Sequence, residues 1–179
     1  MPIKKEQLTV ARPELLDRNG DGEFRRMLYN FFAFGSRLDE ARSRFAAFIG
    51  LSHSQYMALI VISRADPKLE IGVSQVASQL HLSSAFVTIE VNKLVGDGLV
   101  RKVPHSSDRR RVRLVVMPLG YEKLERLAAV QRPVNDALFA TLDRREFEHL
   151  AGIMTRLANS GAQAIHLADH LVASKSAGG

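Results

Sequence analysis

The sequence predicts a mainly α-helical protein with one small β-hairpin, and three observations support this fold class. Apolar residues recur every three or four positions over most of residues 24–95 and 121–171, which is typical of helices with one buried face. The pattern changes to that of two short strands over residues 99–103 and 112–117. The chain has 179 residues, 46% of them hydrophobic, so it is long enough for one sizeable core or two small ones.

The N-terminal part predicts an arm followed by a long helix. The first 20 or so residues are polar and contain two prolines, which favours an extended arm or a short helix. From Phe24 to Phe48 the large apolar residues keep a helical spacing, and Gly50 is expected to end that helix. Its apolar stripe is too long for a small monomer to cover, so we expect part of it to contact another subunit.

Capping signals delimit the next helices. Ser52 as N-cap and Gln55 three residues later form a capping box, which predicts a helix to about residue 64. Gly72 is expected to cap a short helix over residues 73–80, and Ser83 to cap the helix after it. Because only two residues separate the last two helices, the pattern is that of a helix-turn-helix.

The predicted hairpin carries most of the net charge. Between Arg101 and Arg113 there are six Lys and Arg residues against a single acid, Asp108, in a chain with a formal net charge of +6. Such a cluster repels itself in an isolated domain, so it favours a polyanionic partner. A helix pair followed by a basic hairpin is, in outline, a winged helix-turn-helix, whose second helix enters the major groove of DNA while the hairpin reaches the minor groove or phosphates.

The C-terminal part predicts two further helices. Pro118 is expected to open the first, Pro133 to kink or break it, and Asp143 with Glu146 to form a capping box for the last. The predicted organisation has five segments: an N-terminal arm (1–22), a dimerisation helix and second helix (23–65), a winged helix-turn-helix DNA-binding domain (66–117), C-terminal dimerisation helices (118–173) and a flexible tail (174–179).

The second helix of the pair has a predicted DNA-facing side. If Val87, Val91 and Leu94 face the core, the opposite side is free for a ligand. Thr88 and Asn92 can hydrogen-bond bases or phosphates, and the helix N-terminus favours a phosphate. For each of these residues taken singly, the alternative to a DNA contact is an ordinary small or polar surface residue with no ligand. The candidates on the outer face are Ser84, Ala85, Thr88, Ile89 and Asn92.

Residues 80–124, LHLSSAFVTIEVNKLVGDGLVRKVPHSSDRRRVRLVVMPLGYEKL, resemble the MarR family of transcriptional regulators. The shared motifs are a serine-capped recognition helix, the sequence Gly-Leu-Val after it, Asp-x-Arg-Arg in the wing and a helix that opens near a glycine. The motifs span residues 71–124, and the helix order extends the resemblance to 23–171. It implies a homodimer built by the terminal helices, binding to palindromic DNA and, in many members, DNA release when a small phenolic or carboxylate ligand binds near the dimer interface.

The resemblance also implies which residues contact DNA. Asp108 and Arg110 match the Asp-x-Arg of the wing, where the carboxylate can orient a neighbouring Arg for the groove. The chain departs from the family at Ile89, where an Arg is common, at Phe86, where a small polar residue is common, and at Met117, where a Thr usually caps the next helix. The implied DNA-binding residues are Ser83, Ser84, Ala85, Thr88, Ile89, Asn92, Lys93, Asp108, Arg109, Arg110 and Arg111.

A small aromatic or carboxylate effector is expected as a further ligand, and no cofactor. The resemblance places it between the first two helices and the winged domain, where Arg37 or His53 could pair with a carboxylate and Tyr56 could stack on a ring. Phe34 is the fourth candidate. For each of the four, packing or a surface pair is the alternative interpretation.

Metal binding is disfavoured. Asp17 and Asp21 begin a segment like an EF-hand loop, but its twelfth position is Leu28 instead of a bidentate Glu, so a turn that caps the first long helix is expected. His166 and His170 are spaced as an i, i+4 pair, but no third ligand lies on that face.

Other classes of function are excluded or kept as alternatives. The chain contains no GxSxG, P-loop, HExxH or GxGxxG motif, and no cysteine for a thiol nucleophile or redox switch, so no enzyme is predicted. No apolar run reaches the roughly 20 residues of a membrane span, so we expect a cytoplasmic protein without membrane contact. The predicted function is a homodimeric, ligand-responsive repressor that binds double-stranded DNA at a pseudo-palindromic operator. The alternative is a winged-helix module for protein or RNA contacts.

Overall fold

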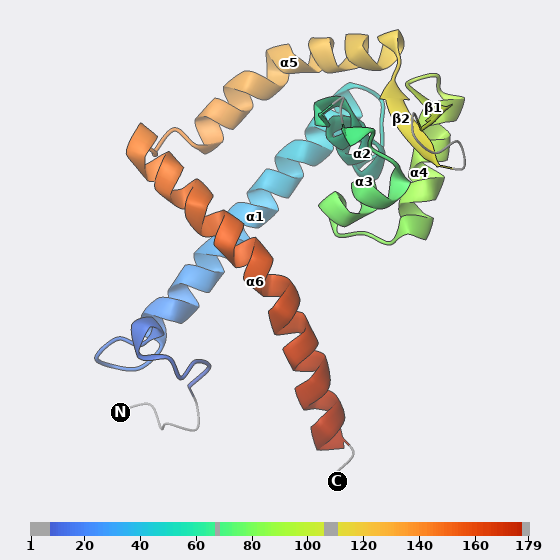
Figure 1. Cartoon of the computed structure of the whole chain (residues 1–179). Coiled ribbons are helices and arrows are strands. Elements are labelled where there is room, and N and C mark those ends of the chain that lie inside the picture. The colour runs from blue at the N-terminus through green and yellow to red at the C-terminus, as the bar shows by residue number, and fades with distance from the viewer. Residues whose placement is uncertain (1–7, 67–68, 106–110, 177–179) are drawn as a thin grey trace. The chain divides into compact units, whose positions relative to one another are not determined.

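The computed structural model describes residues 8–66, 69–105 and 111–176 (Figure 1). The predicted class, mainly α-helical with one small hairpin, is confirmed. Within the described residues the elements follow in the order α1 (Gly22–Phe48), α2 (His53–Arg64), α3 (Val73–Leu80), α4 (Ser84–Gly96), β1 (Val100–Pro104), β2 (Val112–Val116), α5 (Pro118–Leu138) and α6 (Arg144–Ser176), after a 3₁₀ turn at Pro13–Leu15.

The chain divides into two compact units, and the boundary lies inside α5. The first unit reaches Val134, and the second begins at Asn135. All fully buried hydrophobic side chains of the described residues belong to the first unit, where α2, α3, α4 and the hairpin supply most of them. The second unit consists of the end of α5 and the whole of α6.

Helix α1 contributes only its last turn to this core. Phe45 and Ala46 are its buried residues, and the remainder of the helix is half-buried or exposed. Two basic side chains of α5 satisfy carbonyl groups at its C-terminal end: Lys123 Nζ donates to the carbonyl of Ile49 at 2.6 Å, and an Arg126 nitrogen donates to that of Phe48 at 3.0 Å. The end of α1 is therefore fixed by packing and by hydrogen bonds to α5.

The predicted capping box of α2 is confirmed. The Gln55 amide donates to Ser52 Oγ at 3.2 Å, and the Ser52 amide donates to Gln55 Oε1 at 2.8 Å. Gly50, with φ of +71°, turns the chain between α1 and α2. The helix then buries Tyr56, Leu59 and their neighbours against α4 and the hairpin, which makes α2 the central helix of the winged domain.

The turn between α3 and α4 is closed by main-chain bonds. His81 adopts a left-handed conformation with φ of 54°, and the amide of Leu82 donates to the carbonyl of Ala77 at 3.0 Å. Ser83 follows at once as the N-cap of α4, and its Oγ accepts from the amide of Phe86 at 3.2 Å. The short link predicted from the sequence is thus a tight helix-turn-helix.

The hairpin packs on the helices through one face. Its strands are antiparallel, with Val100 opposite Val116 and Lys102 opposite Leu114. Val100, Leu114 and Val116 are buried, and the amide of Leu114 donates to the carbonyl of Ile71 at 2.8 Å. This bond ties β2 to the segment before α3, so the hairpin is held to the helix-turn-helix.

Of the two outcomes expected for Pro133, a kink or a break of α5, the break is wrong, because the helix continues to Leu138 with Pro133 inside it. Val130 and Val134, on either side of the proline, both pack against the core. A proline removes one hydrogen bond, to the carbonyl four residues earlier, and here that residue, Ala129, is exposed to water. Packing on both sides therefore outweighs the local loss.

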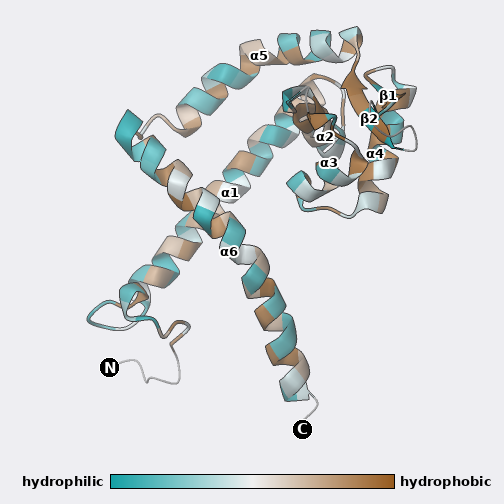
Figure 2. Cartoon of the chain, in the orientation of Figure 1, coloured by the Kyte–Doolittle hydropathy of each residue, from teal (hydrophilic) through white to brown (hydrophobic). Residues whose placement is uncertain are grey.

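Helix α6 begins at its predicted capping box and has no buried residue within the described part of the chain. The Glu146 amide donates to Asp143 Oδ1 at 2.8 Å, and the Asp143 amide donates to Glu146 Oε2 at 2.9 Å. Hydrophobic and hydrophilic residues alternate along the helix (Figure 2). Exposed apolar side chains run along most of its length: Phe147, Leu150, Met154, Leu157, Ile165, Leu167, Leu171 and Val172.

No single helix in the described parts of the chain is long and apolar enough to cross a membrane, and only α1 and α2 taken together, with a bend of 88° between them, reach that length and apolarity.

Candidate nucleic-acid interface

Helix α4 has a buried side and an exposed side, as predicted. Val87, Val91 and Leu94 are buried. The cap residue Ser83 is exposed, and Thr88 is half-buried. The remaining candidates on α4 are exposed: Ser84, Ala85, Ile89, Asn92 and Lys93.

The exposed side of α4 combines apolar and polar groups. Phe86 and Ile89 are 41% and 54% exposed. The Thr88 hydroxyl donates to the carbonyl of Ser84 at 2.7 Å, which leaves its methyl group and its oxygen lone pairs for a ligand. Exposed apolar groups on a recognition helix suit contact with thymine methyl groups.

Strand β1 adds a basic side chain to this side. Lys102 Nζ donates to Asn92 Oδ1 at 2.6 Å, in a contact exposed to solvent. Asn92 was predicted from the sequence, whereas Lys102 was recognised only as part of the basic stretch. The structure joins the recognition helix and the hairpin through these two residues.

Glu90 was missed by sequence reasoning and is buried, with 6% of its surface exposed. Its carboxylate accepts a hydrogen bond from Lys93 Nζ at 2.8 Å and another from Ser52 Oγ at 3.3 Å. The N-cap of α2 is thereby tied to α4. The Lys93 ammonium therefore uses one of its donors on Glu90 of the same helix, although its side chain is 55% exposed. The burial of Glu90 could have been predicted from its position, because it lies three residues after Val87 and four before Leu94, on the same buried side of the helix.

The loop end of the hairpin is braced by contacts with Glu70. Glu70 pairs with Arg113 Nε at 3.1 Å and with His105 Nδ1 at 3.1 Å, and the amide of His105 donates to the carbonyl of Arg111 at 3.0 Å. Arg101 and Arg111 are exposed. The predicted wing residues Asp108, Arg109 and Arg110 lie outside the described residues.

The four candidate effector residues lie on α1 and α2. On α1, Phe34 is 39% exposed and Arg37 pairs with Glu40 at 3.5 Å. On α2, Nδ1 of His53 lies 3.1 Å from Ser43 Oγ, and Nε2 lies 3.4 Å from Asp39. His53 therefore links α2 to α1.

Tyr56, the fourth effector candidate, is buried. Its ring packs edge-on against Phe45, and its hydroxyl accepts from Gln131 Nε2 at 2.9 Å. Burial raises the pKa of the Tyr56 hydroxyl above its ordinary value, so this group is an uncharged phenol at neutral pH. It contributes an apolar ring and a neutral hydroxyl to any ligand that reaches it.

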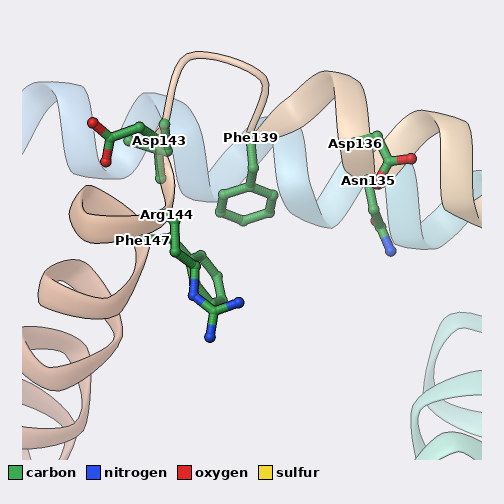
Figure 3. A pocket seen from close by; sticks show the side chains of 7 residues that line it. Asn135, Asp136, Phe139, Asp143, Arg144 and Phe147 are labelled. Atoms are coloured by element: carbon green, nitrogen blue, oxygen red, sulfur yellow. The ribbon is translucent and has the colours of Figure 1, made fainter.

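The second unit contains a cavity of about 420 Å³ at the connection between α5 and α6 (Figure 3). Phe139 and Phe147 contribute apolar walls. Two of its charged groups have local roles, because Asp143 caps α6 and the Arg144 guanidinium pairs with Glu148. The cavity is formed by residues 135–147 and includes none of the predicted DNA-binding residues.

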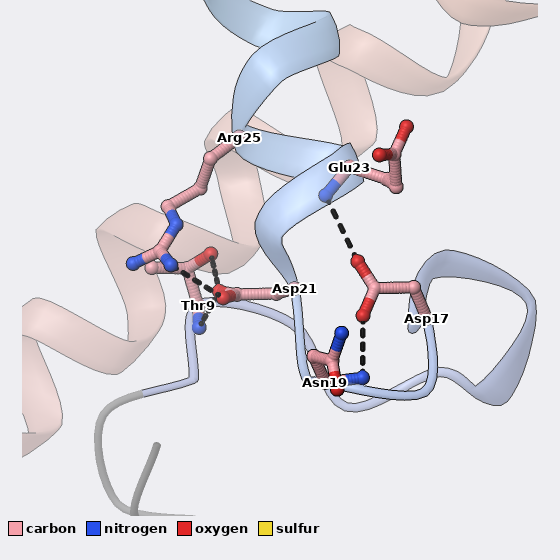
Figure 4. A network of polar contacts seen from close by, with 6 residues as sticks. All are labelled: Thr9, Asp17, Asn19, Asp21, Glu23 and Arg25. Carbon is pink, nitrogen blue, oxygen red and sulfur yellow. Dashed lines mark hydrogen bonds and ion pairs between the residues drawn. The ribbon is translucent and has the colours of Figure 1, made fainter. Parts of the chain in front are cut away.

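The segment that resembles half an EF-hand forms a capping turn (Figure 4). Asp17 accepts from the amides of Asn19, at 2.6 Å, and Glu23, at 3.2 Å. Asp21 is fully buried, and one of its oxygens accepts from the amide of Thr9, at 2.8 Å, and the Thr9 hydroxyl, at 2.6 Å. The expectation of a turn at the start of α1 is confirmed. In the described part of the chain no group of three or more His, Cys, Asp or Glu residues could hold a metal ion.

This turn predicts an acid-sensitive arm. The two bonds from Thr9 hold the pKa of Asp21 below its ordinary value. A lowered folded-state pKa stabilises the contact fully above the unfolded-state pKa of about 3.9, and this contribution is lost as the pH falls through the folded-state value. We expect Thr9→Val to raise the pH at which the arm detaches, measured by hydrogen exchange of residues 8–21. Equal transition pH values in the two proteins would contradict the role of the hydroxyl.

The fold and the site together define a winged helix-turn-helix with a basic wing. Residues 49–111 match the model described as "MarR family". The resemblance seen in the sequence is thus confirmed, and the chain has the fold of a MarR-family transcriptional regulator. No curated protein matches the chain.

Solved structures of transcriptional regulators share this fold. The chain is similar to a MarR/EmrR family regulator from Acinetobacter sp. ADP1, with a TM-score of 0.66 and 19% identity over 78% of this chain and 96% of that one. It is also similar to the M. tuberculosis regulator MosR in complex with DNA, with a TM-score of 0.59 and 20% identity over 76% and 96% of the two chains. A third similar structure is a mutant MarR from E. coli complexed with operator DNA, with a TM-score of 0.61 and 17% identity over 75% of this chain and 95% of that one. The first two are named as transcriptional regulators, in agreement with the predicted class of function.

Proposed function

We propose that the protein is a cytoplasmic, homodimeric repressor that binds double-stranded DNA at a pseudo-palindromic operator. The observation that carries this proposal is the exposed side of α4 beside the basic hairpin: Asn92 and Lys93 are exposed on α4, and Lys102 of β1 contacts Asn92. Arg101 and Arg111 are further exposed cations of the hairpin. A helix with exposed polar groups suits the major groove, and neighbouring cations suit phosphates. The two neighbours solved with DNA support the same use of this fold.

Dimerisation is supported by apolar surface that the single chain leaves exposed. On α1, Phe31 and Phe34 are 46% and 39% exposed, and on α6 Leu150, Met154 and Leu157 are 36%, 38% and 52% exposed. Rows of large apolar side chains on the surface of a chain mark interaction sites. A two-fold dimer would present two copies of α4 to two half-sites of DNA.

We further propose that a small aromatic or carboxylate effector releases the DNA. Phe34, Arg37, His53 and Tyr56 remain the candidates, because His53 and Tyr56 lie on α2, whose N-cap Ser52 is bonded to Glu90 of α4. A ligand that displaces His53 from Asp39 and Ser43 would act at the start of the helix that supports α4. We propose the segments predicted from the sequence as the domain organisation, except that residues 174–176 belong to α6 and not to a flexible tail.

The wing arginine Arg110 gives a direct test of DNA binding. We expect Arg110→Ala to lower affinity for duplex DNA and to flatten the dependence of log affinity on log salt concentration by about one unit, because one phosphate contact is lost. Fluorescence anisotropy on operator fragments enriched from genomic DNA would measure both quantities. Arg44→Ala is the matched control, since Arg44 pairs with Glu40 on α1 and should leave the slope unchanged.

A module for protein or RNA contacts would behave differently. Its affinity for duplex DNA would be weak and nearly independent of salt, and neither Arg110→Ala nor Arg44→Ala would alter it. If the unmodified protein binds duplex DNA strongly and Arg110→Ala has the same dependence of log affinity on log salt concentration, then Arg110 does not contact a phosphate, and the proposed DNA binding still stands.

A further inference from the structure

Ile89 occupies the middle of the exposed side of α4 and takes no part in the core. It lies two residues after the buried Val87 and two before the buried Val91, which is about half a turn from each, so helical geometry points it away from the core. Its side chain is 54% exposed, and it is not among the side chains that pack on the hydrophobic core of the described residues. Isoleucine also ranks below alanine in helix propensity, so the helix itself gains nothing from it.

Ile89 is part of an apolar surface and is not a solitary exposed side chain. Ala85 and Phe86 lie one turn before it on α4, and both are exposed, Phe86 to 41%. When a recognition helix enters the major groove, its N-terminal residues are those that contact base edges. The half of α4 that is placed to meet the bases therefore presents three apolar side chains.

The apolar surface is bordered by polar and cationic groups. Asn92 and Lys93 lie one turn after Ile89 and are exposed, and Lys102 of the hairpin donates to Asn92 at 2.6 Å. This combination suits a partner that is anionic and also presents an apolar group. The major groove of DNA has both, because phosphates line its edges and thymine, alone among the four bases, carries a C5 methyl group there.

We propose that Ile89 is a specificity-determining residue that contacts the C5 methyl group of one thymine in each half-site. The proposal rests on the proposed binding of α4 to duplex DNA. The major-groove edges of adenine, guanine and cytosine present only donors and acceptors, which would lose their water against Ile89 and gain no hydrogen bond. Ile89 therefore favours thymine and disfavours the other bases at this position.

The test removes this methyl group from the DNA and leaves base pairing intact. Selection of bound duplexes from a random-sequence pool first gives the half-site, in which a thymine is expected. Deoxyuridine then replaces each thymine of one half-site in turn, because uracil pairs as thymine does and lacks only the C5 methyl group. At one position the affinity of the unmodified protein, measured by fluorescence anisotropy, is expected to fall by about fourfold, the effect of one buried methyl group.

The variant Ile89→Ala shows whether this loss depends on Ile89. The variant lacks the contact already, so uracil at the sensitive position should cost it little or nothing further, and alanine at an exposed helix position leaves the fold intact. Ile89→Leu keeps an apolar side chain with the same number of carbon atoms and should keep the sensitivity. Leu69→Ala removes a side chain that is 72% exposed outside α4 and the hairpin, and it should behave as the unmodified protein does.

A cytosine at the sensitive position provides the converse experiment. A cytosine–guanine pair there should weaken binding by the unmodified protein. Because 5-methylcytosine places a methyl group at the same point of the groove, it should recover about fourfold in affinity for the unmodified protein and little or nothing for Ile89→Ala.

The outcomes distinguish this inference from the proposed function. If the unmodified protein enriches a half-site that lacks thymine, or if Ile89→Ala responds to uracil at every thymine as the unmodified protein does, the role of Ile89 is overturned while DNA binding stands. An apolar surface used by another protein would give this result. If the unmodified protein enriches no sequence, both the proposed function and this inference fail. Sensitivity to uracil at one thymine, lost in Ile89→Ala but kept in Ile89→Leu and Leu69→Ala, establishes the contact.

Discussion

The variant Leu157→Glu is expected to be monomeric at micromolar concentration, whereas the unmodified chain is expected to be dimeric. Leu157 is 52% exposed on α6, in a row with Leu150 and Met154 that helical spacing places on one side. In the proposed dimer this row is covered by the second chain. A carboxylate in this row would be buried without a partner, which costs more than an interface of this kind can offset.

Loss of the dimer should be visible in DNA binding as well as in mass. Two linked recognition helices bind two half-sites with an effective concentration that raises affinity by about 10²–10⁴-fold, so Leu157→Glu should lose a factor in that range. Light scattering gives the mass and anisotropy gives the affinity. Gln163→Glu adds the same charge on α6 away from the apolar row and should change neither quantity. A dimeric Leu157→Glu with unchanged affinity would remove α6 from the interface.

Local signals explain which parts of the fold were predictable. The capping boxes Ser52–Gln55 and Asp143–Glu146, and the cap at Ser83, each join residues three apart, so the chain itself brings the groups together. Their geometry depends little on the remainder of the molecule, and all three are as predicted.

The less predictable features depend on partners distant in sequence. Glu90 is an acid at a core position. Its buried carboxylate is stabilised by hydrogen bonds from Ser52, 38 residues earlier in the chain, and from Lys93. Similarly, Lys102 reaches Asn92 only because the hairpin packs against α4. Sequence periodicity indicates which side of a helix is buried, but it does not indicate which polar groups meet there.

Gly120 connects the stability of the winged domain to the position of its hairpin. It is buried at the start of α5, where a Cβ atom would lie 2.6 Å from the carbonyl oxygen of Leu99 and 2.8 Å from Val116 Cγ1. That carbonyl already accepts a hydrogen bond from the amide of Met117 at 2.9 Å. Since the closer atom belongs to the backbone, no change of rotamer relieves the overlap. An added methyl group must therefore move α5 away from the hairpin.

Gly120→Ala is accordingly expected to reduce the free energy of unfolding by about 1–3 kcal/mol, the usual cost of overpacking. At an open helix position the same change stabilises by up to about 1 kcal/mol, and Gly96→Ala provides this control because no neighbouring atom of the described residues lies within 4 Å of where its Cβ would be. Denaturant titrations at one fixed protein concentration would compare the midpoints. Equal midpoints for the two variants would contradict the close contact.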